Sequence, residues 1–396
     1  MLSGLAVLLL AVGACGSSGG ATESAAAGSG LDQSKSPILV GWLGGPGGLG
    51  LEHSNDVAKA ATKYLNSTGG VHGRPLKVLT CNDEGTPESV TRCANEFVAA
   101  KVSVVGTRLT TNEAAFLTPI TSAGIPFVEH APVSQAGMGS KNVIGLSGGA
   151  SEGLALAALY GREHNLKSNA LILVNAPPSA AISNAVKPLY DKEGVSYKVQ
   201  LVDAGTPDLT GPVTLATSGD PASLSIFGSA SFCLSGLRAA SSIGYRGQVF
   251  LAGCIDPKVA KDAGSTGNGA IGLAPNDLLA LSPDEVKTYH TAMATYAKDV
   301  DPGTVGAASS FSTFMLIRAV LEAMPADSSY AARDVLDAFH GLRNFSYPFD
   351  GDVPLTCDGK QLRASPSVCS SKSFMVKFDN GSLKPNGYLD FSEILG

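Results

Sequence analysis

The sequence has few charged residues and no cluster of positive charge. Only 16% of its 396 residues are charged, against 44% that are hydrophobic, and the formal net charge is −6. Proteins that bind nucleic acids present basic patches to the phosphates, and this chain has no basic run that could form one. The composition therefore argues against a nucleic acid partner and is typical of a globular protein. Because the chain is longer than a single core usually accommodates, we expect two domains.

Motifs of the common metalloenzymes are missing. The sequence contains no HExxH or CxxC, and its six His are scattered, so no nucleophile constellation or zinc site stands out. Gly45-x-Gly47-x-x-Gly50 matches the dinucleotide fingerprint. However, the acid that should follow about 20 residues later is absent, since the candidate Asp83 comes too late. We expect a protein that is not an enzyme and holds no cofactor; an exported hydrolase and a dinucleotide enzyme are the alternatives.

Long hydrophobic runs are also lacking. The one extended apolar run, Leu5–Val12, is too short to span a bilayer and is typical of a signal peptide, which we place at 1–15. The small residues before Cys15 resemble the bacterial lipobox, which implies diacylglycerol on Cys15 and an extracytoplasmic, membrane-anchored protein. A secretory signal with a chance Cys is the alternative. Residues 16–37 are rich in Gly, Ser and Ala, which favours a flexible tether.

Six cysteines remain after Cys15, and an even number in an exported chain predicts three disulfides. Fifteen connectivities are possible, and a zinc site is the rival interpretation. Cys81 ends an expected strand and Cys93 lies on the inner face of the next helix, so this pair is geometrically plausible. The simplest pairing joins sequence neighbours: Cys81–Cys93, Cys233–Cys254 and Cys357–Cys369.

Strands and helices alternate in two series. Apolar runs predict strands at 38–43, 76–80, 102–105 and 125–128, then at 170–174, 197–202, 224–227, 249–251 and 373–378. Amphipathic or capped segments predict helices between them and at 283–298 and 304–324. The fold class is therefore α/β, with two doubly wound parallel sheets in two lobes.

The segment Val102–Phe116 is the most informative part of the first series. A buried strand ends at Gly106, Arg108 and two threonines follow, and Asn112 is a candidate cap for a helix that starts at Glu113. Ligands of open α/β sheets bind where strands end and helices begin. The Thr110 and Thr111 hydroxyls together with a helix N-terminus favour a carboxylate or another small anion. An ordinary loop is the alternative.

Four further candidate ligand-binding residues lie at or just after the ends of predicted strands. Glu129 and His130 either line a cleft or lie in a solvated loop. Asp256 either contacts a ligand amine or is an exposed acid. Trp42, the only Trp, either stacks on a ligand or packs in the core.

The segment 69–98, GGVHGRPLKVLTCNDEGTPESVTRCANEFV, resembles the branched-chain amino-acid-binding family of ABC-transporter receptors. These are type I periplasmic binding proteins, which are bilobal and hinged. The resemblance covers about 38–378. It rests on the order and spacing of several short elements: Gly69-Gly70, Gly73-Arg74-Pro75-Leu76, Asp83 with Pro87, Gly124-Ile125-Pro126, Asp208-Leu209-Thr210 and Leu237–Gly244.

The resemblance implies where a ligand carboxylate would bind. In the family, a Ser/Thr cluster after the third strand and the loop after the fourth strand contact the ligand's α-carboxylate. Thr110 and Thr111 match the first position, and the loop from Ala131 to Ser134 matches the second.

The second lobe matches the family less well. The family's aromatic positions fall here on the segment ending at Ser179 and on the segment starting at Ser229. The position of the acid that binds the α-ammonium falls near Cys254, with Asp256 two residues on. Because an unpaired buried ammonium is strongly unfavourable, we expect a carboxylate without an amine, or a larger apolar solute.

The resemblance also implies the organisation of the whole chain. Lobe one would comprise 38–147 and 275–344, and lobe two 148–274 and 345–396, joined by three hinge crossings. We expect a monomeric, lipid-anchored receptor that captures a small solute and delivers it to the permease and ATPase subunits of an ABC importer. An extracellular sensor on the same fold is the alternative.

Overall fold

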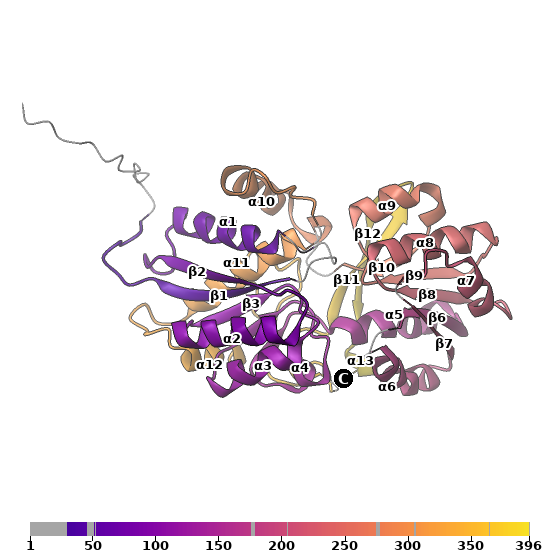
Figure 1. Ribbon diagram of the computed structural model, residues 1–396, viewed down its shortest axis with the longest axis horizontal. Coiled ribbons are helices and arrows are strands. Elements are labelled where there is room, and N and C mark those ends of the chain that lie inside the picture. Colours follow the sequence, from indigo (N-terminus) through magenta and orange to yellow (C-terminus); the bar gives the residue numbers. More distant parts are fainter. Residues whose placement is uncertain are drawn as a thin grey trace, which may run out of the picture.

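The protein is described by a computed structural model covering residues 30–45, 51, 53–175, 179–203, 205–274, 278–304, 306–363 and 365–395. These residues form two lobes, each a sheet with helices on both faces (Figure 1). The predicted signal peptide, Cys15 and most of the glycine-rich segment at 45–50 lie outside the described residues. No helix in the described part of the chain is long and apolar enough to cross a membrane.

The first lobe contains a parallel five-stranded sheet in the order β2-β1-β3-β4-β5. Its strands are β1 (Ile38–Gly44), β2 (Leu76–Asn82), β3 (Val104–Thr107), β4 (Phe127–Glu129) and β5 (Val143–Gly145). Strand β1 pairs with both β2 and β3, and nearly all of its side chains are buried. Such a strand is covered on both faces, which explains its continuous apolar sequence.

Helices cover both faces of this sheet (Figure 1). Val57 of α1 and Phe314 of α11 belong to the core on one face, and Phe97 of α2 and Phe116 of α3 to the core on the other. Helix α2 starts as its sequence predicts, with Pro87 in the first turn and the Thr86 hydroxyl accepting the Ser89 N–H. The helices are α1 (Ser54–Ser67), α2 (Pro87–Ala100), α3 (Glu113–Ser122), α4 (Gln135–Gly139), α10 (Pro283–Tyr296), α11 (Ala307–Ala323) and α12 (Ala332–His340).

The second lobe contains a seven-stranded sheet in the order β12-β11-β10-β9-β8-β6-β7. Strands β6 to β10 are parallel, and β11 and β12 form an antiparallel hairpin beside β10. The strands are β6 (Ser168–Val174), β7 (Ser196–Val202), β8 (Ser223–Phe227), β9 (Gln248–Ala252), β10 (Ile271–Leu273), β11 (Lys372–Asp379) and β12 (Ser382–Asp390).

Two groups of helices cover this second sheet. Leu237 of α8 and Val259 of α9 belong to one core, whereas Leu156 of α5 and Leu189 of α6 belong to the core of the opposite face. The elements are α5 (Gly149–His164), α6 (Ser179–Lys192), α7 (Thr210–Ala216), α8 (Ala230–Ser242), α9 (Pro257–Ala263), α13 (Ser392–Leu395) and the 3-10 helices η1 (Gly264–Gly267) and η2 (Leu278–Ala280).

The C-terminal part of the chain contributes to both lobes. Tyr347, Phe349 and Leu355 pack in the core of the first lobe, and the β11–β12 hairpin completes the second sheet. The structure therefore corrects one predicted boundary: the segment 345–396 does not belong to the second lobe as a whole. Its apolar side chains after α12 continue to cover the first sheet. The other lobe boundaries stay predictions.

The first and third crossings between the lobes are hydrogen-bonded to each other. The backbone N–H of Gly145, at the end of β5, donates to the Ser367 carbonyl at 2.9 Å, and the Cys369 N–H donates to the Gly145 carbonyl at 2.8 Å. Cys369 is also bonded to Cys357. The two segments therefore meet at an isolated parallel bridge between Gly145 and Val368, where the chain passes between lobes.

All three predicted disulfides are confirmed. They are Cys81–Cys93, Cys233–Cys254 and Cys357–Cys369. The first joins the end of β2 to the inner face of α2, as the sequence predicts. A zinc site at these cysteines is thereby excluded, and no group of His, Cys, Asp or Glu in the described part of the chain could hold a metal ion.

Candidate functional site

The predicted binding residues of the first lobe gather where β3 and β4 end. Thr107 and Glu129, the last residues of these strands, are register partners, so Arg108 and His130 leave the sheet side by side. The Thr107 hydroxyl donates to the Leu43 carbonyl of β1 at 2.9 Å, which ties three adjacent strand ends together. The carboxyl ends of neighbouring parallel strands are the usual ligand-binding edge of such sheets.

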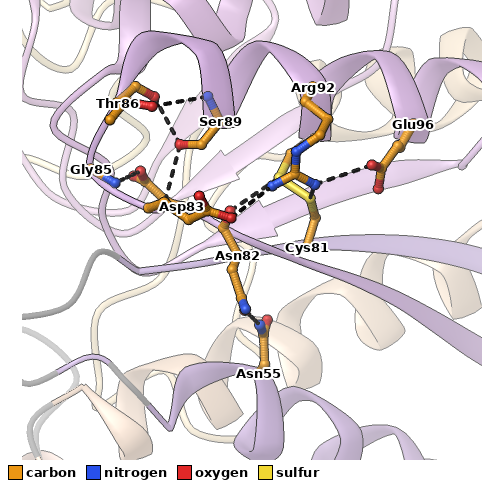
Figure 2. A network of polar contacts seen from close by, with 11 residues as sticks. Asn55, Cys81, Asn82, Asp83, Gly85, Thr86, Ser89, Arg92 and Glu96 are labelled. Carbon is orange, nitrogen blue, oxygen red and sulfur yellow. Dashed lines mark hydrogen bonds and ion pairs between the residues drawn. A yellow bond between two sulfur atoms is a disulfide. The ribbon is translucent and has the colours of Figure 1, made fainter.

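Thr110 is engaged within the lobe. Its hydroxyl donates to Oδ2 of Asp83 at 2.7 Å and accepts the Asn112 N–H at 3.2 Å. Oδ1 of Asp83 accepts the Gly85 N–H, and Figure 2 shows this contact beside the Thr86 cap of α2. Both Thr110 and Asp83 are buried. In this conformation the hydroxyl therefore has no proton to donate to a solute.

The start of α3 differs from the prediction in one respect. The helix begins at Glu113, as expected, but Asn112 makes no capping hydrogen bond with its side chain. Its amide instead donates to the exposed Thr111 hydroxyl at 3.4 Å. Thr111, unlike Thr110, is thus on the surface of the lobe.

Glu113 accepts hydrogen bonds from two backbone N–H groups in the loop that was expected to bind a ligand carboxylate. Its Oε2 receives the Val133 N–H at 3.1 Å and the Ser134 N–H at 2.7 Å. These amides belong to the loop after β4, which the family resemblance matches to a carboxylate-binding loop. Sequence reasoning identified Glu113 only as the first residue of a helix. The one feature of the sequence that could have drawn attention to Glu113 is its place as an acid in the first turn of a helix, where the helix dipole stabilises a carboxylate.

Glu129 is a buried carboxyl next to Glu113. Burial raises its pKa well above the usual range, the charge and hydrogen bond of Glu113 raise it further, and Arg108 lowers it. The raised pKa favours the protonated form of this acid. Glu129 is fully buried, so the solvated loop left open by the sequence is not what forms here.

Arg108 is a partly buried cation at the same strand end. Burial lowers its pKa to about 10, and the nearby Glu129 opposes this. Its buried Nε has no hydrogen-bond acceptor among the described residues. A guanidinium N–H of this kind is available to an anionic group.

The loop after β4 also contacts the first crossing between the lobes. The Ser147 hydroxyl donates to the carbonyl of the buried His130 at 2.9 Å. A Cβ at Gly149 would lie 2.3 Å from the Pro132 carbonyl oxygen. Ala131, between them, is partly buried, and the Ser134 hydroxyl caps α4. The predicted binding loop is therefore held by the hinge region.

The predicted residues of the second lobe have local structural partners. Ser229 caps α8 by accepting the Phe232 N–H, and Oδ1 of Asp256 accepts the Lys258 and Val259 N–H groups at the start of α9. Ser179 is the buried first residue of α6, and the segment 176–178 before it lies outside the described residues. Asp256 is mostly buried, so it is not the exposed acid of the alternative interpretation.

Trp42 packs in the core, which was one of its two predicted roles. It is fully buried, and its ring lies 5.1 Å from that of Phe314 on α11. A Cβ at Gly106 would meet the Trp42 ring at 2.8 Å, so the glycine makes room for it. In this conformation Trp42 has no surface to offer a solute.

Two surface pockets of about 450 Å³ lie in the first lobe, away from these residues. One is bounded by the end of α4 and by the chain beyond α12, with Lys141, His340 and Arg343 in its lining. The other pocket is lined by residues shown in Figure 2. There Arg92 lies between the Cys81–Cys93 disulfide and Glu96, and Asn82 contacts Asn55. Neither lining contains a predicted ligand-binding residue.

Similarity to known proteins identifies the family. Residues 39–366 match the sequence profile of the family described as "Periplasmic binding protein". No curated protein sequence matches significantly.

Solved structures share the fold at low sequence identity. A leucine binding protein, LivK, from Thermotoga maritima has a TM-score of 0.70 at 15% identity, covering 90% of this chain and 99% of that one. A fatty acid ABC transporter substrate-binding protein from Thermomonospora curvata has a TM-score of 0.73 at 14% identity, covering 91% and 95%. A solute binding protein from R. palustris in complex with benzoate has a TM-score of 0.68 at 16% identity, covering 89% and 96%.

These matches agree with the two lobes and the mostly parallel sheets described above. The type I periplasmic binding protein fold expected from the sequence is confirmed. Because the profile spans most of the chain, this protein belongs to the periplasmic binding protein family, whose members are extracytoplasmic solute receptors of ABC transporters and not enzymes.

Proposed function

We propose that this chain captures a small carboxylate-bearing solute between its lobes and delivers it to the permease and ATPase subunits of an ABC importer. Family membership supports the receptor role. Solved structures of the same fold include complexes with isoleucine, leucine, benzoate and 4-hydroxybenzoate, all of which carry a carboxylate. We further propose that diacylglycerol on Cys15 holds a monomeric receptor at the outer face of the membrane.

The observation that carries the proposed solute class is the state of Arg108. It is a partly buried cation at the strand ends of the first lobe, and its Nε lacks an acceptor among the described residues. Burying a guanidinium without a full set of acceptors is costly, and a solute carboxylate would supply them. Glu129 does not, because no hydrogen bond joins its carboxyl oxygens to the Arg108 Nε.

The test compares carboxylates with their amides. Leucine, isoleucine, benzoate, 4-hydroxybenzoate and octanoate are screened by thermal shift against leucinamide and benzamide, and hits are measured by calorimetry. We expect at least one acid, and not its amide, to stabilise the wild-type protein. Arg108→Gln should weaken its binding by about 1.5–3 kcal/mol, the range for a hydrogen bond to a charged group.

Arg92→Gln is the matched control, because Arg92 is an exposed arginine of the same lobe that pairs with Glu84 and Glu96. It should leave the affinity unchanged. Failure of every acid and amide to stabilise the wild-type protein would contradict the proposed solute class. Equal affinity of the wild-type and Arg108→Gln proteins would remove Arg108 from the site.

A further inference from the structure

The loop after β4 has two backbone donors that point at one carboxylate, and that carboxylate belongs to the protein. The N–H groups of Val133 and Ser134, here called the amide pair, both donate to Oε2 of Glu113. Two converging N–H groups beside a helix N-terminus form a typical anion-binding arrangement. In this chain the arrangement is already filled.

Several features hold Glu113 in this position. It is the first residue of α3 and is almost fully buried, so its carboxylate faces the loop and not the solvent. A Cβ at Gly137 of α4 would lie 1.4 Å from Oε1 of Glu113, and only glycine leaves room for that oxygen. The contact therefore depends on residue choices in two helices as well as on the loop.

The surroundings oppose a second negative charge. The carboxyl of Glu129 lies against Glu113, and Arg108 is the cation that interacts with Glu129. A solute carboxylate placed at the amide pair would meet the Glu113 carboxylate and find both N–H donors occupied. Like charges at such a distance in a buried site are strongly unfavourable.

We infer that Glu113 is a specificity-determining residue: its carboxylate permanently occupies the amide pair, so the acid group of the solute is excluded from that position and is bound by the guanidinium of Arg108. The location of the solute acid rests on the proposed function. The occupation of the amide pair by Glu113 rests on the geometry of this chain alone. The receptor would therefore accept acids whose single polar end meets one arginine and whose remainder is apolar.

Chemical rescue tests the inference. Glu113→Ala leaves the amide pair without an acceptor and opens a space the size of a small acid. Sodium formate or acetate at millimolar concentration should raise the melting temperature of this variant by several degrees, compared with sodium chloride at the same ionic strength. The wild-type protein should show no such rise. Glu113→Gln is the matched control, because its side-chain oxygen still occupies the amide pair; it should also not respond.

The outcomes separate the inference from the proposed function. Rescue of Glu113→Ala supports the inference, even if no acid in the solute panel binds the wild-type protein, in which case only the proposed solute class fails. Absence of rescue in a folded Glu113→Ala protein, or an equal response of the wild-type protein, overturns the inference while leaving the receptor role intact.

A second measurement needs no variant, in case Glu113→Ala does not fold. The wild-type protein is crystallised with the tightest acid of the panel. We expect the Glu113 carboxylate on the Val133 and Ser134 amides and the acid at Arg108. An acid found on the amide pair, with Glu113 turned away, would overturn the inference.

Discussion

Glu152 is a buried acid at the base of the second lobe. It lies in the first turn of α5 and accepts a hydrogen bond from the Ser373 hydroxyl of β11, so it joins the first helix after the crossing to the C-terminal hairpin. Its pKa is raised to about 8: burial is the main cause and Asp390 adds to it, whereas hydrogen bonds to Ser373 and to the Gly148 backbone oppose the rise. The folded protein therefore holds a proton here that the unfolded chain releases at lower pH.

This difference predicts the direction of a pH effect on stability. A carboxyl whose pKa is higher in the folded state contributes stability that is complete below the unfolded pKa of about 4.5 and is lost as the pH rises through about 8. A tenfold change in proton affinity corresponds to about 1.4 kcal/mol, so the loss between about pH 5 and pH 8 amounts to a few kcal/mol at most. Urea unfolding across this range should show the wild-type protein losing stability.

Glu152→Gln removes the titrating group, so its stability should depend less on pH. The control is Glu163→Gln, an exposed acid on the same helix, which should keep the wild-type dependence. Identical slopes for the wild-type and Glu152→Gln proteins would show that Glu152 does not hold this proton.

The sequence was enough to locate the candidate site residues where β3 and β4 end, but it could not identify their hydrogen-bond partners. Arg108, Thr110 and Glu129 follow or end strands, and that placement can be read from the apolar runs before them. Thr110 donates to Asp83, which follows β2. Glu113 accepts from the loop after β4, which is separated from it in sequence by α3 and β4. Such contacts depend on side-chain geometry after folding, for which sequence periodicity carries no signal.

At the scale of elements, the start of α5 is a tightly constrained point between the lobes. Gly149, its first residue, has a φ of +58°, where side chains other than glycine are disfavoured. The Pro132 carbonyl oxygen lies where a Cβ would be. The helix therefore begins immediately against the loop that carries the amide pair.

Gly149→Ala should lower the free energy of unfolding by about 2–4 kcal/mol, because both the left-handed backbone and the contact with Pro132 become unfavourable. Gly124→Ala separates the two causes: Gly124 has a φ of +68° but open space around it. It should cost only about 1–2 kcal/mol, from the backbone alone. Chemical denaturation measures both. Equal losses would mean that the Pro132 contact contributes nothing.

Long apolar elements were predictable, whereas some of the shortest elements were not. The strands and helices with continuous apolar faces, such as β1 and α11, match their predicted ranges within a few residues. Strand β5 has three residues and α4 has five, too few for a period to be recognised. Strand β12 contains Pro385 and many polar residues; it forms at the sheet edge because β11 pairs with it.

At the scale of the whole molecule, the predicted lipid anchor decides where the receptor meets its solute. With Cys15 lipidated, the wild-type protein should appear in the membrane fraction of cells, because the acyl chains insert into the bilayer. A Cys15→Ser protein should be released from that fraction, as measured by fractionation and immunoblotting. Ser17→Ala, a neighbouring control, should stay with the membrane. Membrane association of Cys15→Ser would contradict the anchor.

The C-terminal segment of the chain also sets an order of events during synthesis. Residues Tyr347 to Leu355 fill the core of the first lobe, and the β11–β12 hairpin covers the open edge of β10 in the second. A nascent chain that has not yet reached these residues leaves both cores uncovered and a strand edge unpaired. Neither core is complete before translation is nearly finished, so the folded receptor forms only when almost the whole chain is available.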